Sequence, residues 1–373
     1  MKNKIHKYDF LVIGAGLIGA ITALALVKKK FKVLVIDKKN NVPRDNRTLA
    51  VNANSIDFLK RQGVWENLIS KPQKIEKIVI EDNINDQPLI FVNDKEPMGN
   101  VIFNKELYGI TRKRLENLKI LEVDVNIDFN KLLPNKTTKI NKNNYSFKKI
   151  IVSIGKNIIS DVNHKSIVFD QEQHSYVGFF KHSKNHNNTA YEIFTQDGPL
   201  AVLPSPSTKK NRSTFIYSSR KKIDINRLQK TIHKKFEKSH GKLMFDKSIS
   251  KFPITPHLTK NNKNFIYVGD SLKSIHPVAG QGWNLGIKDI ETLCKLLDQY
   301  SLEKENFNSY YYSRRMIEST IYFSFTSILN YLYENNSAFN NKIIKIGYRG
   351  LKKIKILRDI FIKQAMGRFN LTY

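Results

Sequence analysis

The chain has 373 residues, 40% of them hydrophobic, with 63 Lys or Arg against 33 Asp or Glu, which gives a formal net charge of +30. This length and apolar content exclude a disordered chain and favour two closely packed domains, while the single cysteine, Cys294, excludes an intramolecular disulfide and favours the reducing cytoplasm. The positive charge fits nucleic acid, an anionic membrane or compositional bias alone, but the sequence has no arginine-rich block, CxxC pair or aromatic RNA-binding strand, so we expect no nucleic-acid partner.

The first apolar stretch, residues 10–27, is uncharged and long enough for a membrane span or a signal peptide. Its glycine spacing instead favours a strand over 10–13, a helix over 17–29 and a strand over 33–36 that ends in Asp37. Both strands are continuous apolar runs, as expected of parallel strands that are covered on both faces. The start of the chain therefore predicts a βαβ unit.

The glycines of this unit, Gly14, Gly16 and Gly19 in "VIGAGLIG", predict a dinucleotide site. Such glycines permit a tight turn and let a pyrophosphate approach the backbone N–H groups at a helix N-terminus. Asp37 stands near the spacing at which an acid binds the adenosine ribose. The alternative is a structural glycine turn, and the motif does not separate NAD from FAD.

The middle of the chain predicts α/β texture followed by a β-rich second domain. Leu49, Ile56 and Leu59 have near-helical spacing, and a buried strand is expected in "FKKIIVSIG". Further expected elements are a strand in 74–82, a short helix and a strand in 107–126, a β-rich sheet over 170–221, and an amphipathic helix over 227–239 that crosses this sheet.

A second glycine cluster, "GDSLKSIHPVAGQGWNLGIKD" from Gly269 to Asp289, follows the apolar strand "NFIYV". It places a second helix N-terminus at the carboxyl edge of the same sheet. FAD is long enough to benefit from contacts at its flavin end, which Asp270, Gly280 and Gly282 can supply. In the helix after the glycines, an apolar stripe is expected to pack on a neighbour: Ile287, Ile290, Cys294 and Leu297.

The last seventy or so residues predict helices. One apolar stripe at helical spacing comprises Ile317, Ile321, Phe325, Ile328 and Leu332. Residues 341–373 contain nine Lys or Arg and only one acid, Asp359, a balance of +8, and they carry a second stripe at Leu351, Ile354, Leu357 and Phe361. A basic amphipathic helix of this kind can lie on an anionic leaflet, and the alternative is a helix packed on the protein.

The motifs "GAGLIG", "DNRTLAV" and "GDSLKSIHPVAGQGWNLGIKD" together resemble those of the FAD-dependent aromatic hydroxylases, the group A flavoprotein monooxygenases. "EIFTQDGPLAVLP", "FPITP" and "FIKQAMG" resemble the ubiquinone-biosynthesis branch. The resemblance implies an α/β fold with a Rossmann-like FAD-binding domain, an interleaved β-sheet substrate domain and C-terminal helices. We expect the FAD-binding domain over 1–75, 101–165 and 256–300, the substrate domain over 76–100 and 166–255, and the helical region, with its possible membrane-surface contact, over 301–373.

The resemblance also implies roles for individual residues. Gly14, Gly16, Gly19 and Asp37 would hold the ADP half of FAD, and Arg47, in an Asp45-x-Arg47 pattern, would lie near the flavin and the pyrophosphate. Around the flavin end it implies Asp270 at the ribitol and pyrophosphate, Pro277 at a turn of the chain, and Gly280, Gln281, Gly282 and Asn284 beside the isoalloxazine. His276 is interpreted as structural, and no catalytic side chain is predicted because the flavin drives the reaction.

One family motif, close to ADGxxSxxR, is largely missing. In "SIGKNIISD" Ile154 replaces the acid, Ile158 the serine and Asp161 the arginine, and only Gly155 is kept. Lys273 replaces the histidine of a GDxxH pattern. Because the missing motif serves the pyrophosphate and the nicotinamide donor, the electron donor stays open between NAD(P)H and another reductant.

The implied function is hydroxylation of a polyprenylated phenol in ubiquinone biosynthesis, with O2 and a flavin hydroperoxide. The implied location is the cytoplasm, peripheral on the inner face of the cytoplasmic membrane, with a quinone-biosynthesis complex as partner. Two alternatives stay open: an FAD reductase of prenyl chains, and a flavin-binding or scaffold subunit that has lost turnover, which the missing Asp-Gly motif suggests. The ring carbon, the oligomeric state and the length of the prenyl tail are not specified by these motifs.

Overall fold

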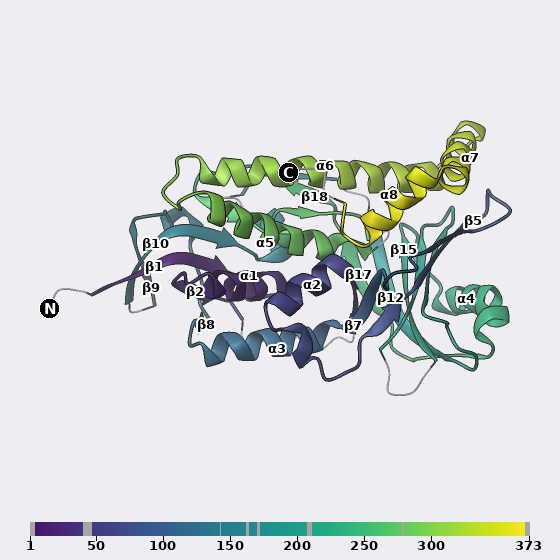
Figure 1. The fold of residues 1–373 in the computed structure, drawn as a ribbon, viewed down its shortest axis with the longest axis horizontal. Coiled ribbons are helices and arrows are strands. Elements are labelled where there is room, and N and C mark those ends of the chain that lie inside the picture. Colours follow the sequence, from purple (N-terminus) through teal and green to yellow (C-terminus); the bar gives the residue numbers. More distant parts are fainter. Residues whose placement is uncertain are drawn as a thin grey trace.

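A computed structural model describes residues 4–39, 47–141, 143–161, 164–169, 172–206, 211–277 and 280–369. In this part of the chain, a parallel sheet flanked by helices and a larger, mostly antiparallel sheet lie at opposite ends of the molecule (Figure 1). A long helix, α6 (Phe307–Glu334), runs across the side of both. The α/β class predicted from the sequence is confirmed.

The first sheet contains the predicted βαβ unit. β1 (Ile5–Ile13), α1 (Leu17–Lys28) and β2 (Val33–Ile36) follow one another, and β1 begins five residues earlier than expected. The sheet is completed by β8 (Leu121–Glu122), β10 (Asn143–Val152) and β19 (Phe265–Tyr267), in the parallel order β19-β10-β1-β2-β8, with β9 (Thr137–Ile140) antiparallel to β10. All carboxyl ends of the parallel strands therefore meet at one edge.

The second sheet confirms the β-rich texture predicted for the middle of the chain. Its central strands are β12 (Gln173–His182), β13 (Thr189–Phe194), β14 (Leu200–Pro204) and β15 (Arg212–Ser219). It is extended by β5 (Lys77–Asp82), β6 (Leu89–Val92), β16 (Leu243–Phe245) and β17 (Ser250–Ile254). The predicted amphipathic helix, α4 (Ile225–His240), packs on this sheet through Leu228, Ile232 and Phe236.

Two small sheets correct details of the sequence prediction. One joins β3 (Thr48–Asn52), β7 (Gly99–Phe103) and β4 (Gln73–Ile75), so Leu49 lies in a strand, and the helix expected around it is the shorter α2 (Ala53–Arg61). The other joins β11 (Ser166–Val168), β18 (His257–Thr259) and β20 (Lys273–Ser274), so β11 pairs with strands expected in the other domain. The remaining short elements are α3 (Asn104–Asn117), η1 (Trp65–Asn67), η2 (Phe129–Lys131), η3 (Gly155–Ser160) and η4 (Gly269–Ser271).

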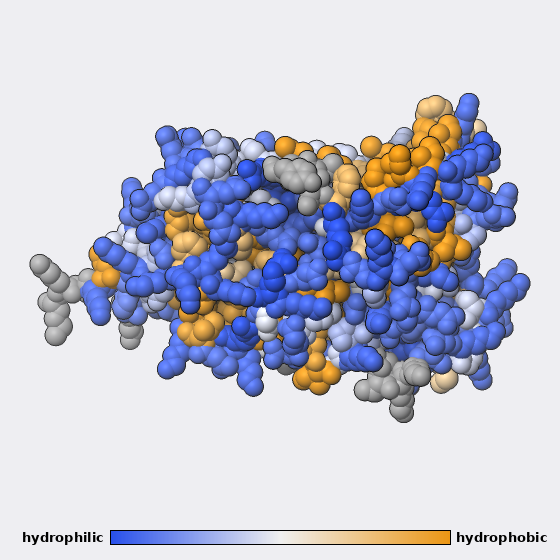
Figure 2. Space-filling model, viewed as in Figure 1, coloured by the Kyte–Doolittle hydropathy of each residue, from blue (hydrophilic) through white to orange (hydrophobic). Residues whose placement is uncertain are grey.

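The C-terminal helices differ from the prediction in what they cover. After α6 come α7 (Ala338–Lys353) and α8 (Lys355–Ala365). The prediction of one basic helix across 351–361 is therefore wrong, because Ile354 separates two helices. Leu351 and Phe361 pack near β6, where the Phe361 ring stacks on Phe91 with centroids 4.2 Å apart. Figure 2 shows hydrophobic residues gathered over α7 and α8.

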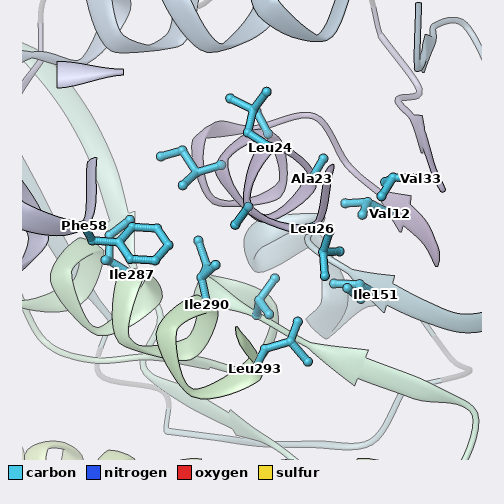
Figure 3. Packing of buried hydrophobic residues seen from close by; sticks show 14 of the residues in the cluster. Val12, Ala23, Leu24, Leu26, Val33, Phe58, Ile151, Ile287, Ile290 and Leu293 are labelled. Atoms are coloured by element: carbon cyan, nitrogen blue, oxygen red, sulfur yellow. The ribbon is translucent and has the colours of Figure 1, made fainter. Parts of the chain in front are cut away.

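The main core lies between α1 and α5 (Gly282–Gln299), as Figure 3 shows. Ile287, Ile290 and Leu293 of α5 are fully buried there, and Cys294 and Leu297 pack at the edge of the same cluster, as the predicted stripe requires. The first turns of the two helices are also close, since Ile18 fills the space beside Gly269 and Gly286. This packing fixes both glycine motifs at the same edge of the first sheet.

Candidate cofactor and active site

A cavity of about 1010 Å³ lies where the two glycine motifs meet the second sheet. Of the predicted cofactor residues, those that line it are Gly14, Gly16, Asp37, Arg47, Asp270, Pro277, Gly280 and Gly282. Three predicted residues are not among its lining: Gly19, Gln281 and Asn284. Residues more than 250 positions apart in the sequence are thus brought to one cavity.

The nucleotide loop has the geometry that its glycines predict. Gly14 has φ +99°, and a Cβ added there would overlap the carbonyl oxygen of Ser153. A Cβ on Gly19 would overlap the carbonyl oxygen of Gly14, so this residue serves close packing of helix on strand, away from the cavity. Nothing lies within 4 Å of a Cβ on Gly16, which caps α1 and lines the cavity.

Asp37 follows β2 and holds the loop as well as lining the cavity. One carboxylate oxygen accepts a hydrogen bond from the backbone N–H of Ala15 at 2.6 Å, and the other accepts one from Lys39 at 3.0 Å. The side chain is only half-buried, so the same carboxylate stays accessible from the cavity. This is the position in which a ribose hydroxyl could donate to it.

Arg47 reaches the cavity from the segment before β3. Its guanidinium lies 4.5 Å from the centroid of the Phe252 ring, in the "FPITP" motif of β17. Two family motifs that are 200 residues apart in sequence are therefore in contact. Asp45, the other member of the predicted pattern, lies outside the described residues.

Asp270 lines the cavity from η4. The residue is exposed to the cavity, but nearby protein partly desolvates the carboxyl and raises its pKa, while the positive charge of Lys156 acts to lower it. The backbone oxygen of Asp270 accepts a hydrogen bond from Nε2 of the fully buried His257 at 2.8 Å. The loop is thus held by its backbone, which leaves the carboxylate available to the cavity.

Lys156 is a cavity residue that the sequence analysis missed. It lies in η3, donates from Nζ to the carbonyl oxygen of Pro253 at 3.1 Å, and lines the cavity. Burial lowers the pKa of its amine, Asp270 acts to raise it and Arg47 to lower it, so both charges are near. The sequence feature that could have predicted this cavity residue is its position two residues after Ile154, where the family has an acid.

The residues that replace the family motifs lie in different environments. Ile158 is fully buried in the second core cluster, whereas Ile154, packed at the edge of this cluster, and Asp161 both line the cavity. Lys273 is buried and forms an ion pair with Asp289 at 2.6 Å. The two isoleucines therefore supply packing where the family motif supplies polar groups.

The ion pair of Lys273 belongs to a buried charge network beneath η4. Asp289 also accepts from Arg315 Nε at 2.7 Å and from the backbone N–H of Gly269 at 2.9 Å. Arg315 and Lys288 each pair with Glu318 at 2.5 Å, which links α5 to α6. Burial, opposed by Asp289, lowers the pKa of Lys273 to about 8.

His276 and Asn284 support the flavin-side loop from behind. Nε2 of His276 hydrogen-bonds to Gln173 Oε1 at 2.5 Å, and burial lowers the pKa of the imidazole to about 4, which agrees with a structural role. Asn284 is buried, accepts from the backbone N–H of Asn52 at 3.0 Å and donates to the carbonyl oxygen of Ala50 at 3.0 Å. It therefore ties the start of α5 to β3.

The C-terminal motif "FIKQAMG" packs against this support. The carbonyl oxygen of Met366 accepts from the backbone N–H of Asn54 at 3.0 Å, and a Cβ on Gly367 would clash with the side chain of Asn52. Lys288 Nζ donates to the carbonyl oxygen of Phe369 at 2.9 Å. Among the described residues no group of three or more His, Cys, Asp or Glu side chains could hold a metal ion.

Comparison with known proteins agrees with this geometry. Residues 7–138 match the family model described as FAD binding domain, and residues 203–346 match the squalene epoxidase model. The fold is similar to that of p-nitrophenol 4-monooxygenase PnpA from Pseudomonas putida, with a TM-score of 0.76 at 12% identity over 99% of this chain and 100% of that one. PqsL from Pseudomonas aeruginosa gives a TM-score of 0.67 at 14% identity, over 88% and 97% of the two chains.

Among proteins of known role, the ubiquinone biosynthesis monooxygenase COQ6 of Caenorhabditis elegans is 24% identical over 84% of either chain. Ubiquinone hydroxylase UbiL of Rhodospirillum rubrum is 24% identical over 97% of this chain and 90% of its own. The 3-demethoxyubiquinol 3-hydroxylase of Escherichia coli is 22% identical over 96% and 98%. Fold and site define a flavoprotein of the FAD-dependent aromatic hydroxylase class. Within that class, the chain is similar over most of its length to the ubiquinone-biosynthesis hydroxylases.

Proposed function

We propose that this protein is an FAD-dependent monooxygenase that hydroxylates the ring of a polyprenylated phenol on the route to ubiquinone. The observation that carries the proposal is the single cavity that both glycine motifs share with the second sheet. The sheet contributes apolar walls from Val177, Ile216 and Ile254, against which an aromatic ring can pack. The relatives that match most of the chain are named for the same chemistry.

The residues around the cavity fit FAD. Its volume of about 1010 Å³ lies at the upper end of the range of roughly 300–1,000 Å³ for ligand pockets. Gly16 and Gly282 both line it with no protein atom closer than 4 Å to the Cβ that they lack, which leaves room for a ligand. Trp283, another lining residue, has a buried indole Nε1 without a hydrogen-bond partner among the described residues.

We assign the binding roles as follows. The N-terminus of α1 with Gly14 and Gly16 would hold the pyrophosphate, Asp37 the ribose, and Lys156 would add a positive charge beside the phosphates. At the other end, the N-terminus of α5 would stabilise negative charge on the pyrimidine side of the flavin. Gly19 and Asn284 would act indirectly, by packing and by hydrogen bonds to β3, and Gln281 would act through the loop that it shares with Gly282.

The chain itself would orient the substrate and exclude water. Bound FAD, once reduced, supplies the chemistry that activates O2 for insertion of one oxygen atom into the ring. Burial lowers the pKa of His276 to about 4 and also lowers the pKa of the buried His257, so both imidazoles are weak bases against the flavin loop and the protein would act by positioning. Val177, Ile216 and Ile254 would hold the ring in a site with little water.

The replaced motif favours a second candidate, a flavin-binding subunit of a quinone-biosynthesis complex without turnover of its own. Ile154 and Ile158 stand where the family has its acid and serine, so an apolar side chain lines the cavity at 154 and the side chain at 158 is buried in the core. The rate at which NADH and NADPH reduce the bound flavin separates the two candidates. Reduction by either donor supports the enzyme, and none with any donor tested supports the subunit.

We also propose that the protein works as a peripheral protein on the inner face of the cytoplasmic membrane, because a polyprenylated substrate resides in the bilayer. No described helix is both long and apolar enough to cross a membrane. The exposed lysines of α7 and α8 would meet anionic lipid. Recovery of the whole protein in the soluble fraction at low salt would contradict this location.

The function is tested by lipid extracts of a strain that lacks the gene. We expect accumulation of a quinone precursor with one ring oxygen fewer, and restoration of the quinone by the intact chain. The variant Asp270→Ala, matched with an Asp246→Ala control outside the cavity, should fail to restore it. Normal quinone content in the deletion strain would overturn the proposal.

A further inference from the structure

The exposed side of α6 is an unusual surface for this chain. Five large side chains lie along it at helical spacing and are each 47–60% exposed: Ile317, Ile321, Phe325, Ile328 and Tyr331. We name this set the α6 apolar face. At 1.5 Å per residue it is about 21 Å long. The spacing that predicts a helix is thus correct, but most of the predicted stripe faces outward.

The α6 apolar face contains no charge. Residues 316–333 include one charged residue, Glu318, which is buried and paired with Arg315 and Lys288. The other exposed residues of this stretch are Thr320 and Ser324. Of all residues in the chain, 26% are charged, and 63 are Lys or Arg. A run of eighteen residues without an exposed charge therefore indicates a surface that is covered by a partner when the protein functions.

Basic residues and further apolar residues continue this surface on α7 and α8. Helix α7 exposes Phe339 and Ile346 and also exposes Lys342, Lys345 and Lys353. Figure 2 shows the hydrophobic patch over α7 and α8 with hydrophilic residues at its edges. Apolar side chains bordered by lysines fit the boundary between acyl chains and anionic headgroups.

We propose that the α6 apolar face, together with the basic helices α7 and α8, is the surface by which the protein docks on an anionic lipid bilayer. A second copy of the chain is disfavoured as the occupant, because each copy carries a net charge of +30 and the lysines border the patch. An anionic leaflet complements both the apolar and the basic parts of the surface.

The docking surface lies on the back of the helix that supports the flavin loop. On its inner side, Tyr322 and Phe323 pack against Ile275 and Leu285, next to the cavity-lining Pro277. A helix is about 10 Å across, so a docked bilayer would lie roughly one helix away from the active-site wall. The inference rests on the proposed function, because it assumes a prenylated substrate that passes from the bilayer to the active site on this side of the protein.

The test is co-sedimentation of the full-length protein with vesicles of phosphatidylcholine containing 30% phosphatidylglycerol. The variant carries Ile321→Gln, Phe325→Gln and Ile328→Gln, which exchange exposed side chains for a polar residue that favours helix. The control carries Ile69→Gln and Met244→Gln, two hydrophobic residues that are as exposed but lie outside α6, α7 and α8. We expect at least a tenfold loss of vesicle binding in the triple variant and less than a twofold change in the control.

Equal vesicle binding by the triple variant and the wild type would overturn the docking surface. So would a wild-type dimer in light scattering that the triple variant turns into a monomer, since a second copy would then cover the face. FAD content is measured in parallel and should be unchanged in the triple variant. A wild-type chain that binds vesicles but never FAD would contradict the proposed function and leave the docking surface standing.

Discussion

At the residue scale, Lys156 is the residue that we propose to hold the phosphates of the cofactor in a chain that lacks the acid of the Asp-Gly motif. The carbonyl of Ser153 lies against Gly14, and Ser271 hydrogen-bonds to the carbonyl oxygen of Gly155 at 3.4 Å. The turn that bears Lys156 is therefore held between the nucleotide loop and η4. Lys156 lines the same cavity as the first residues of α1, whose N-terminus is the natural place for a pyrophosphate.

Replacing this cation should weaken cofactor binding. Lys156→Met is expected to raise the Kd for FAD about tenfold, which corresponds to about 1.4 kcal/mol, because a charge-assisted contact to phosphate is lost. Lys156→Arg should stay within a few-fold of the wild type. The measurement is titration of the apoprotein with FAD and separately with ADP, and Lys139→Met, an exposed lysine outside the cavity, is the control. Unchanged binding of both ligands by Lys156→Met would remove the residue from the site.

The cavity residues differ in how far sequence could predict their place. Gly14 and Gly16 could be predicted to line the cavity because a short local motif fixes their geometry. Lys156 could not, because its position depends on Pro253, which approaches only in the folded chain. Asn284 belongs to the expected loop, but its amide turns away to hydrogen-bond Asn52, a contact across 232 residues.

At the element scale, the packing of α5 on α1 brings the two glycine motifs together. The βαβ unit and the apolar stripe of α5 were predictable, since continuous apolar strands and a stripe at helical spacing are local patterns. The division of "KIEKIVIED" into β4 and β5 was not predictable, because the two strands join different sheets. The outward orientation of the apolar stripe on α6 was not predictable either, because helical periodicity identifies an apolar face but not what covers that face.

The first turn of α5 offers a direct test of the cavity. Gly282→Val places methyl groups where the nearest protein atom, Ile275 Cγ1, is 4.0 Å from the new Cβ, so the fold should tolerate the change. The same methyl groups would fill part of the cavity in which we place the flavin. We expect wild-type thermal stability of the apoprotein and an FAD affinity at least a hundredfold lower, measured by flavin absorbance after gel filtration. Full flavin occupancy in this variant would contradict the assignment of the flavin end.

At the scale of the whole molecule, three buried histidines make stability depend on pH. His182 ends β12, His186 lies in the loop before β13 and His240 ends α4, with ring centroids 4.7 Å apart for the 182–240 pair and 5.7 Å for the 182–186 pair. Burial and the neighbouring rings lower the pKa of both His186 and His240 to about 4. These imidazoles therefore remain neutral in the fold at a pH where an unfolded chain would protonate them.

The free energy of unfolding should fall on acidification. Since the folded pKa values lie below the unfolded value of about 6.5, the stability that the neutral histidines contribute is complete above pH 6.5 and is lost as the pH falls toward 4. Urea unfolding at pH 7.5, 6 and 4.5 measures this dependence. His240→Phe, whose ring would pack against Phe180 and Phe236, should flatten it. An unaltered slope in this variant would show that other groups carry the pH dependence.

The central claim is that the chain uses FAD to place an oxygen atom from O2 on an aromatic ring. The most direct measurement is mass spectrometry of quinone intermediates from cells that express the intact chain in the deletion strain and are supplied with isotopically labelled O2. We predict one labelled oxygen atom in the ring at the position that is missing without the protein. Recovery of the quinone with this oxygen derived from water, or no recovery by the intact chain, would contradict the account.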